Sequence, residues 1–277
     1  MKFVSERTPE PVIAVLGASG KVGSALANIL AEQGYKLFFP NKESLNKDLL
    51  EINPNFILNC IGAGTDFNRR QSDDDMWCAN YEVPSNLLNL SNSLGANFIT
   101  IGSILEKIVT FKSSYIESKR AFTNRVVRSH SFLPTSISIL TPIVFGLAQE
   151  HALLEDIISA AKTRGVVPLE SPNAIRDFIH VQDLARVVGS LMEMREFPRP
   201  YIEIGSGVGY QLSHLCESVL GDGAGATWKS KFDVNRTNEF SVVANLETTK
   251  QILPYRIDHE LVQWLKARIS MPAEVRK

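Results

Sequence analysis

The stretch VIAVLGASGKVG, residues 12–23, decides how the rest of the chain is interpreted. Residues 12–16 form a short continuous apolar run, which a parallel strand buried on both faces requires, and the run stops at Gly17. Gly20 and Gly23 follow, where helical spacing of apolar residues begins. At such a strand-to-helix turn, backbone N–H groups and the helix dipole can face a pyrophosphate at close range. The stretch therefore predicts a dinucleotide-binding turn, and the alternative is a plain glycine-rich turn.

Short apolar runs and helical spacing continue to alternate along the chain. This alternation predicts an α/β fold, a Rossmann-type doubly wound parallel sheet. We expect an NAD(P)-binding domain over residues 1–145, to which 177–203 return, and a smaller C-terminal α/β substrate-binding lobe over 146–277. A second glycine cluster, 205–209, is interpreted as a structural turn. Strands are expected at 12–16, 37–39, 56–59, 98–101, 137–140 and 201–204, and helices at 22–33, 80–94, 115–128, 152–163 and 181–194.

The composition favours small-molecule chemistry. The 29 basic residues nearly balance the 30 acidic ones among 277, which argues against nucleic acid or an anionic membrane as partner. No apolar stretch reaches the about 18 residues of a spanning helix, and the N-terminal MKFVSERTPEPV lacks the apolar core of a signal peptide. A cytoplasmic protein is expected. Cys60, Cys78 and Cys216 have no metal-type spacing, so we expect buried small hydrophobes and no metal site.

A tyrosine and a lysine lie four residues apart in YIESK, residues 115–119. On a helix, Tyr115 and Lys119 share a face, and an ammonium beside a phenol lowers the phenol's pKa and makes it a usable proton donor. The alternative is an ordinary helix face. Ser103 follows the strand expected at 98–101 and could hold the same carbonyl oxygen, which favours the catalytic interpretation.

The choice of nucleotide depends on the end of the second expected strand. An acidic residue there would hold the ribose 2′-hydroxyl of NAD, but no carboxylate occurs in this segment before Glu43. Lys42 and Lys21 are available for a 2′-phosphate instead. This favours NADP over NAD, and the alternative is that both lysines are merely solvated.

Several motifs occur in an order that resembles the extended short-chain dehydrogenases/reductases, the NAD-dependent epimerase/dehydratase family. The resemblance covers most of the chain and implies an NAD(P)-dependent enzyme acting on a nucleotide sugar. It rests on GASGKVG (17–23), NCIGAG (59–64), NYEVPSNLL (80–88), Ser103, YIESK (115–119), TPIVFG (141–146), RDFIHVQDLA (176–185) and IEIGSG (202–207).

The resemblance also implies roles for individual residues. Tyr115 would be the acid, Lys119 would bind the nicotinamide ribose and Ser103 would polarise the substrate carbonyl. Arg176 and Arg236 would face the substrate's diphosphate, to which a guanidinium is well suited. The expected coenzyme contacts are Gly17, Ser19, Gly20, Lys21, Val22, Gly23, Asn41, Lys42, Cys60, Ile61, Gly62, Tyr115, Lys119, Pro142, Ile143 and Val144. Asp177, His180 and Asp183 are expected to serve structure.

Three departures from the family pattern narrow the function. Dehydratases of the family carry an Asp-Glu pair after the catalytic hydroxyl residue, whereas Ser103 is followed by Ile104 and Leu105. The short paths from 39 to 56 and from Ser103 to Tyr115 are closer to nucleotide-sugar 4-ketoreductases, such as dTDP-4-dehydrorhamnose reductases and CDP-dideoxysugar synthases. Thr141 stands where the family commonly has arginine.

The expected function is therefore NAD(P)H-dependent reduction of a 4-keto-6-deoxy nucleotide sugar. A nucleotide-sugar 4-epimerase that retains NAD is the first alternative. A non-catalytic NAD(P)-binding regulatory or assembly protein is the second, since fold does not fix function. A homodimer through the helices near 80–94 and 115–128 is common in the family.

Overall fold

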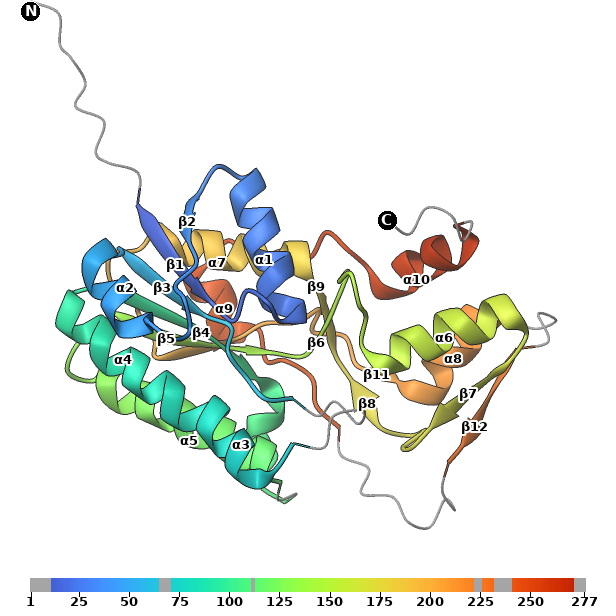
Figure 1. The fold of residues 1–277 in the computed structure, drawn as a ribbon. Coiled ribbons are helices and arrows are strands. Elements are labelled where there is room, and N and C mark those ends of the chain that lie inside the picture. Colours follow the sequence, from blue (N-terminus) through green and yellow to red (C-terminus); the bar gives the residue numbers. More distant parts are fainter. Residues whose placement is uncertain (1–10, 65–70, 111–112, 222–225, 232–240, 272–277) are drawn as a thin grey trace, which may run out of the picture. The chain divides into compact units, whose positions relative to one another are not determined.

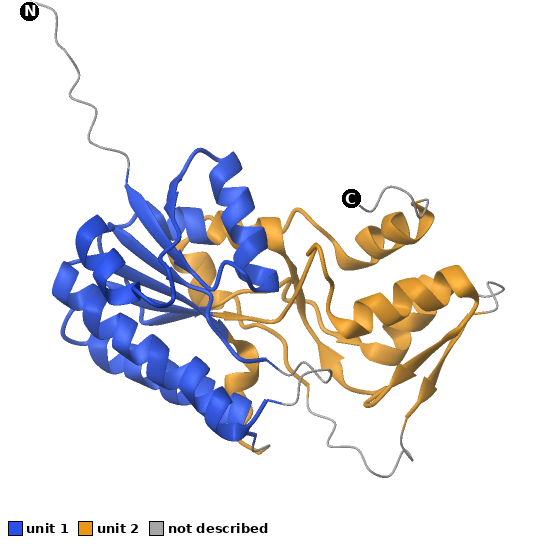
Figure 2. Ribbon diagram, in the orientation of Figure 1, with its two compact units in different colours: residues 1–102, 113–139, 188–202 blue, residues 103–112, 140–187, 203–277 orange. Residues whose placement is uncertain are grey.

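A computed structural model of the chain describes residues 11–64, 71–110, 113–221, 226–231 and 241–271. Its residues form two compact units, coloured blue and orange in Figure 2. Unit 1 comprises residues 1–102, 113–139 and 188–202, and unit 2 comprises 103–112, 140–187 and 203–277. Arg236, one of the two arginines predicted to bind the diphosphate, lies outside the described residues.

Unit 1 is built on a six-stranded sheet (Figure 1). β1 pairs in parallel with β2 and β3, and β3 pairs in parallel with β4. The chain runs outward from β1 to β2 and then crosses to β3 on the other side of β1, so the strand order reverses between β1 and β3. The order across the sheet is β10 (Tyr201–Glu203), β5 (Ser136–Thr141), β4 (Asn97–Ser103), β3 (Phe56–Asn59), β1 (Val12–Leu16) and β2 (Lys36–Phe38).

Helices alternate with these strands, and the predicted α/β Rossmann-type fold class is confirmed. The core of unit 1 joins β1, β3 and β4 to the apolar faces of the helices, as where Phe122 of α5 meets Phe98 of β4 edge to face. The helices are α1 (Lys21–Glu32), α2 (Leu45–Ile52), α3 (Asp73–Trp77), the π-helical turn η1 (Cys78–Glu82), α4 (Val83–Leu94) and α5 (Ser114–His130). Within α7 (Val181–Met192) the chain passes from unit 2 to unit 1.

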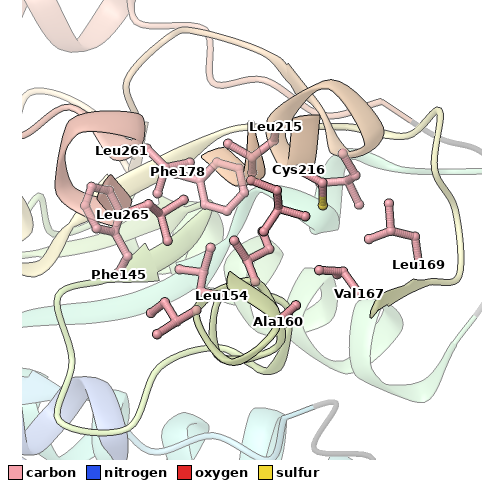
Figure 3. Close-up of a cluster of buried hydrophobic side chains, with 14 of the residues drawn as sticks. Phe145, Leu154, Ala160, Val167, Leu169, Phe178, Leu215, Cys216, Leu261 and Leu265 are labelled. Carbon is pink, nitrogen blue, oxygen red and sulfur yellow. The ribbon is translucent and has the colours of Figure 1, made fainter. Parts of the chain in front are cut away.

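Unit 2 combines short strand pairs with helices. Its core lies between the helices and strands α6, α8, α10, β6, β7 and β9 (Figure 3). The pairs are β6 (Ile143–Phe145) with β9 (Phe178–His180), β7 (Val166–Leu169) with β12 (Thr227–Ser230), and β8 (Ile175–Arg176) with β11 (Tyr210–Gln211). The helices are η2 (Ile104–Lys107), α6 (Ala152–Thr163), α8 (Leu212–Leu220), α9 (Glu247–Ile252) and α10 (Leu261–Ser270).

The cysteine expectation is partly wrong. Cys216 is buried in the core of unit 2 and Cys60 is half-buried, but Cys78 is exposed. Cys78 begins the π-helical turn that buries Asn80, and residues two apart on a helix face different directions. Within the part of the chain that the structure describes, no helix has both the length and the apolar character that crossing a bilayer requires.

Candidate active site

The glycine-rich turn after β1 packs backbone against backbone. Gly17 has φ +76°, and a Cβ added to it would lie 2.6 Å from the carbonyl carbon of Cys60. A Cβ on Gly23 would lie 2.2 Å from the carbonyl oxygen of Gly17. Both glycines are therefore required by close approach, and the turn at Gly20 carries no side-chain cap. Ser19, Gly20 and Lys21 are exposed and Val22 is half-buried, so backbone N–H groups at the start of α1 can meet an anion.

The turn after β3 forms the other side of this contact. Cys60 N–H donates to the carbonyl of Leu16 at 2.9 Å, and Ile61 N–H donates to Asn59 Oδ1 at 3.2 Å. Burial raises the pKa of the Cys60 thiol to about 12, with Lys119 acting in the opposite direction, so Cys60 is a neutral packing residue. Gly62 is exposed at the tip of the turn.

Tyr115 and Lys119 lie in the first two turns of α5. The Ser113 side chain caps this helix by accepting from Ile116 N–H at 3.2 Å. Lys119 Nζ donates to the carbonyl of Ile101 in β4 at 3.2 Å, and a Cβ added to Gly62 would lie 3.0 Å from the same Nζ. The ammonium of Lys119 therefore lies at the end of β4 and against the turn after β3, where coenzyme contacts are predicted.

Asn80 begins the motif NYEVPSNLL (80–88) but is not among the predicted site residues. Its side chain is 1% exposed, and Oδ1 accepts from Ala63 N–H at 2.9 Å. Nδ2 donates to the carbonyl of Ala63 at 3.1 Å and to Ser118 Oγ at 3.2 Å. Asn80 thus joins the turn after β3 to the helix that carries Tyr115. Asn80 lies in η1, four residues before the buried Pro84 of α4, and this helical spacing is the signal that could have found it.

Ser103 ends β4 and belongs to unit 2, whereas Tyr115 and Lys119 belong to unit 1. Ser103 Oγ accepts from Leu105 N–H at 3.3 Å, and Ser103 N–H donates to Glu106 Oε1 at 2.8 Å. This reciprocal cap starts η2 and leaves the hydroxyl hydrogen able to donate elsewhere. The side chain of Ile104 packs into a buried apolar cluster with Ile108, Leu140 and Val242.

The remaining described residues of the predicted site in unit 2 lie on its short strands or next to them. Pro142 and Ile143 are half-buried and Val144 is buried where β6 begins, and Ile143 pairs with Phe178 of β9. Arg176 ends β8, and its Nη1 donates to the carbonyl of Ile175 at 3.0 Å. Burial lowers the pKa of Arg176 to about 10, so its guanidinium stays charged at neutral pH.

The loop after β2 is bound by a carboxylate of α2 that the local sequence does not reveal. Asp48 of α2 accepts from Asn41 N–H through Oδ2 at 2.8 Å, and Asn41 Oδ1 accepts from Glu43 N–H at 3.0 Å. Lys42, between them, is exposed. The loop therefore holds the predicted cation Lys42 close to an anion of α2, Asp48, six residues further along the chain.

Residues 13–205 match the model of the NAD dependent epimerase/dehydratase family, well over half of the chain. The chain belongs to this family. Membership confirms the predicted family and makes the protein an NAD(P)-dependent enzyme of the oxidoreductase type. Comparison with curated proteins gave no significant match.

Solved structures from three organisms resemble this chain over more than nine-tenths of its length. GDP-mannoheptose C4 reductase from Campylobacter jejuni, with NADP bound, is 14% identical and has a TM-score of 0.75, covering 95% of this chain and 98% of its own. A dTDP-4-dehydrorhamnose reductase from Clostridium acetobutylicum is 16% identical, with a TM-score of 0.74 over 93% and 98%. UDP-glucose 4-epimerase from Thermotoga maritima, with UDP-glucose, is 16% identical, with a TM-score of 0.76 over 93% and 97%. At these identities the likeness concerns the fold.

Proposed function

We propose that this enzyme is an NAD(P)H-dependent reductase of a nucleotide sugar that carries a keto group, with a 4-keto-6-deoxy sugar as the expected substrate. The observation that carries the proposal is the position of Lys119. Its ammonium is held by the carbonyl of Ile101 beside Gly62, one helical turn from Tyr115. This position lies between the end of β4 and the turn after β3, as a lysine that serves both a coenzyme and a tyrosine acid requires.

The residues divide the chemistry among them. The coenzyme, when bound, supplies the hydride that reduces the keto carbon. Tyr115 Oη gives its proton to the keto oxygen, and the Ser103 hydroxyl donates a hydrogen bond to that oxygen as negative charge develops. Lys119 then faces the phenolate of Tyr115, and its positive charge stabilises that anion. The convergence of Ser103 with Tyr115 and Lys119 is part of the proposal.

The surroundings of Ser103 argue against a dehydratase. A dehydratase needs acidic groups that move protons to and from the sugar. Here the adjacent Ile104 is packed in an apolar cluster, and the Glu106 carboxylate caps η2 by accepting from Ser103 N–H. An isoleucine side chain has no proton to exchange, and the Glu106 carboxylate serves as part of the η2 cap.

A nucleotide-sugar 4-epimerase is the second candidate. It would use the same three residues, and the likeness to UDP-glucose 4-epimerase is as close as the likeness to the reductases. The two functions differ in the fate of the coenzyme, because an epimerase keeps and regenerates it whereas a reductase consumes it.

NADP is the coenzyme that we expect the reductase to prefer. Lys42 and Lys21 are exposed at the two turns that would face the adenosine half of the coenzyme, and either can pair with a 2′-phosphate. Arg176 is assigned to the substrate's diphosphate, because a buried guanidinium gains most from a doubly charged partner. Cytoplasmic location and a homodimer through α4 and α5 stay predictions.

The first experiment incubates the purified enzyme and NADPH or NADH with freshly prepared 4-keto-6-deoxy sugars linked to dTDP, CDP or GDP, and follows the absorbance of the reduced coenzyme. Stoichiometric oxidation with one sugar would establish the reductase and name its nucleotide. Tyr115→Phe should abolish turnover and leave NADPH binding intact, and Tyr35→Phe is the control because Tyr35 lies outside the proposed site. No oxidation, together with nicotinamide released on denaturation, would favour the epimerase. An unchanged rate for Tyr115→Phe would overturn the mechanism.

A further inference from the structure

We infer that Asp177 is a positioning residue that holds Arg176 where it can bind the diphosphate of the substrate. The inference rests on the proposed function, in which Arg176 takes the diphosphate. Sequence patterns assign Asp177 only to structure, next to the arginine in RDFIHV. All the contacts that carry the inference lie within unit 2.

The carboxylate of Asp177 is a buried hub for hydrogen bonds. Its side chain is 1% exposed. Oδ1 accepts from Phe178 N–H at 2.6 Å, and from Ser206 N–H at 2.9 Å and Ser206 Oγ at 2.6 Å. Oδ2 accepts from Gly207 N–H and from Ala244 N–H, both at 3.1 Å. A buried carboxylate is tolerated because charge-assisted bonds replace its water, and here they reach two distant segments.

Those two segments are the neighbours of Arg176. On one side Tyr210 of β11 pairs antiparallel with Arg176, shortly after Ser206 and Gly207. On the other side Val242 forms a parallel bridge to Arg176, and its N–H donates to the carbonyl of Ile175 at 3.1 Å. The Asp177 carboxylate therefore ties both flanking segments at positions next to their pairing with β8.

The hub leaves little freedom to its surroundings. A Cβ added to Gly205 would lie 2.3 Å from Asp177 Oδ2, so the backbone of the segment before β11 runs directly against the carboxylate. Adjacent residues of an extended chain point their side chains to opposite sides. The hydrogen bonds of Asp177 thus act on the backbone around Arg176. They fix the position of the backbone from which the Arg176 side chain extends.

The test compares Asp177→Asn and Arg176→Gln, singly and combined. An asparagine presents one acceptor oxygen, and its NH2 group would face N–H donors, so at least two backbone tethers are lost. Isothermal titration calorimetry measures the affinity for UDP, dTDP, CDP and GDP, and the tightest of the four serves as probe. Asp177→Asn should weaken this nucleoside diphosphate about tenfold in the native background and less than about twofold in the Arg176→Gln background. NADPH affinity should be unchanged in both.

Asp183→Asn is the matched control. Asp183 is equally buried in unit 2 and accepts from Arg186 Nη2 and from His259 N–H, away from β8. It should lower the melting temperature and leave diphosphate affinity unchanged. If Asp177→Asn does not fold, Ser206→Ala removes one bond to the hub and should give a smaller loss in the same direction.

Each outcome bears on one of the two ideas. Equal losses from Asp177→Asn in both backgrounds, or a loss no larger than that of Asp183→Asn, would overturn the positioning role and leave Arg176 as diphosphate ligand. No loss from Arg176→Gln, or no binding of any of the four nucleotides by the unmodified enzyme, would remove the proposed function of Arg176. The inference about Asp177 would fall with it.

Discussion

Gly62 is the residue where the turn after β3, the ammonium of Lys119 and the amide of Asn80 meet. Its backbone conformation suits any residue, but a Cβ would lie 3.0 Å from Lys119 Nζ and 3.2 Å from Asn80 Oδ1. Both are tighter than ordinary contacts. The atoms that an added Cβ would displace are the ends of side chains and not backbone. Adding a methyl group at Gly62 should therefore disturb the ammonium of Lys119 far more than the fold.

Gly62→Ala should therefore lower kcat about tenfold by displacing the ammonium, since small misplacements at a reacting centre are costly. The melting temperature should change little. Gly64→Ala is the matched control, because no heavy atom lies within 4 Å of its added Cβ. Steady-state kinetics and thermal unfolding measure both effects. Equal kcat values for the two variants would show that Lys119 tolerates the methyl group.

The loop after β2 bears on the choice between NADP and NAD, because it contains Lys42 and is bound by Asp48. Lys42→Ala should weaken NADPH about tenfold and leave NADH unchanged, because a charged partner of the 2′-phosphate is lost. Asp48→Asn should strengthen NADPH, because asparagine can still accept from Asn41 N–H while the negative charge disappears. Fluorescence titration with both coenzymes measures the dissociation constants. A parallel loss for NADPH and NADH in Asp48→Asn would assign Asp48 to loop anchoring alone.

Sequence patterns reach some of these residues and miss others for a physical reason. Tyr115 and Lys119 are four residues apart, so helical periodicity alone gives them one face. Asn80 acts on Ala63 and Ser118, which lie 17 and 38 positions away. Such contacts depend on the order of the strands and on how the helices pack on the sheet. A local sequence pattern determines neither.

At the scale of elements, the pair β6 and β9 is held around His180, which is buried. Its ring stacks on His259 with centroids 4.0 Å apart and meets Phe145 edge to face at 5.0 Å. Nδ1 accepts from Gln182 N–H at 3.2 Å, so this nitrogen carries no proton. Burial, and secondarily His259, lower the pKa of His180 to about 4, while Asp183 acts in the opposite direction.

The sign of the resulting pH dependence follows from linkage. The unfolded chain takes up a proton at His180 near 6.5, whereas the folded protein does so near 4, so folding is weakened as the pH falls through this window. The unfolding free energy should fall by about 2 kcal/mol between about pH 7 and about pH 5 through this residue. Urea unfolding of His180→Asn should lack that part of the loss. His214→Asn, at an exposed position of α8, should retain it. Identical pH dependences of the unfolding free energy for the unmodified protein and both variants would contradict the lowered pKa of His180.

Long helices and strands with a continuous apolar run could be predicted from the sequence, whereas the shortest strands and one short helix could not. β1 and β3 appear as expected, and α5 encloses the predicted helix at 115–128. The two-residue strands β8 and β11 offer too few positions for a period to emerge. The same brevity hid α2, whose eight residues fill the path that the sequence suggests to be a short loop.

At the scale of the whole molecule, the predicted ligand contacts divide between the units. Most predicted coenzyme residues, at 17–23, 41–42 and 60–62, belong to unit 1, as do Tyr115 and Lys119, whereas those at 142–144 belong to unit 2. Arg176 and its hub belong to unit 2. A ligand slows hydrogen exchange in the segments whose opening would release it, so each ligand should leave its own pattern of protection.

Hydrogen exchange followed by mass spectrometry can test this division. At about 100 times its dissociation constant, NADPH should stabilise its segments by up to about 2.7 kcal/mol and slow exchange up to about 100-fold at 12–23 and 59–64. The tightest of UDP, dTDP, CDP and GDP should instead protect 175–180 and 205–211, the segments tied by Asp177. Lys119→Ala and Arg176→Gln are the paired controls, each expected to remove one pattern and spare the other. If both ligands protected the same peptides, the assignment of the coenzyme to 12–23 and 59–64 and of the diphosphate to 175–180 and 205–211 would be wrong, whatever the reaction proves to be.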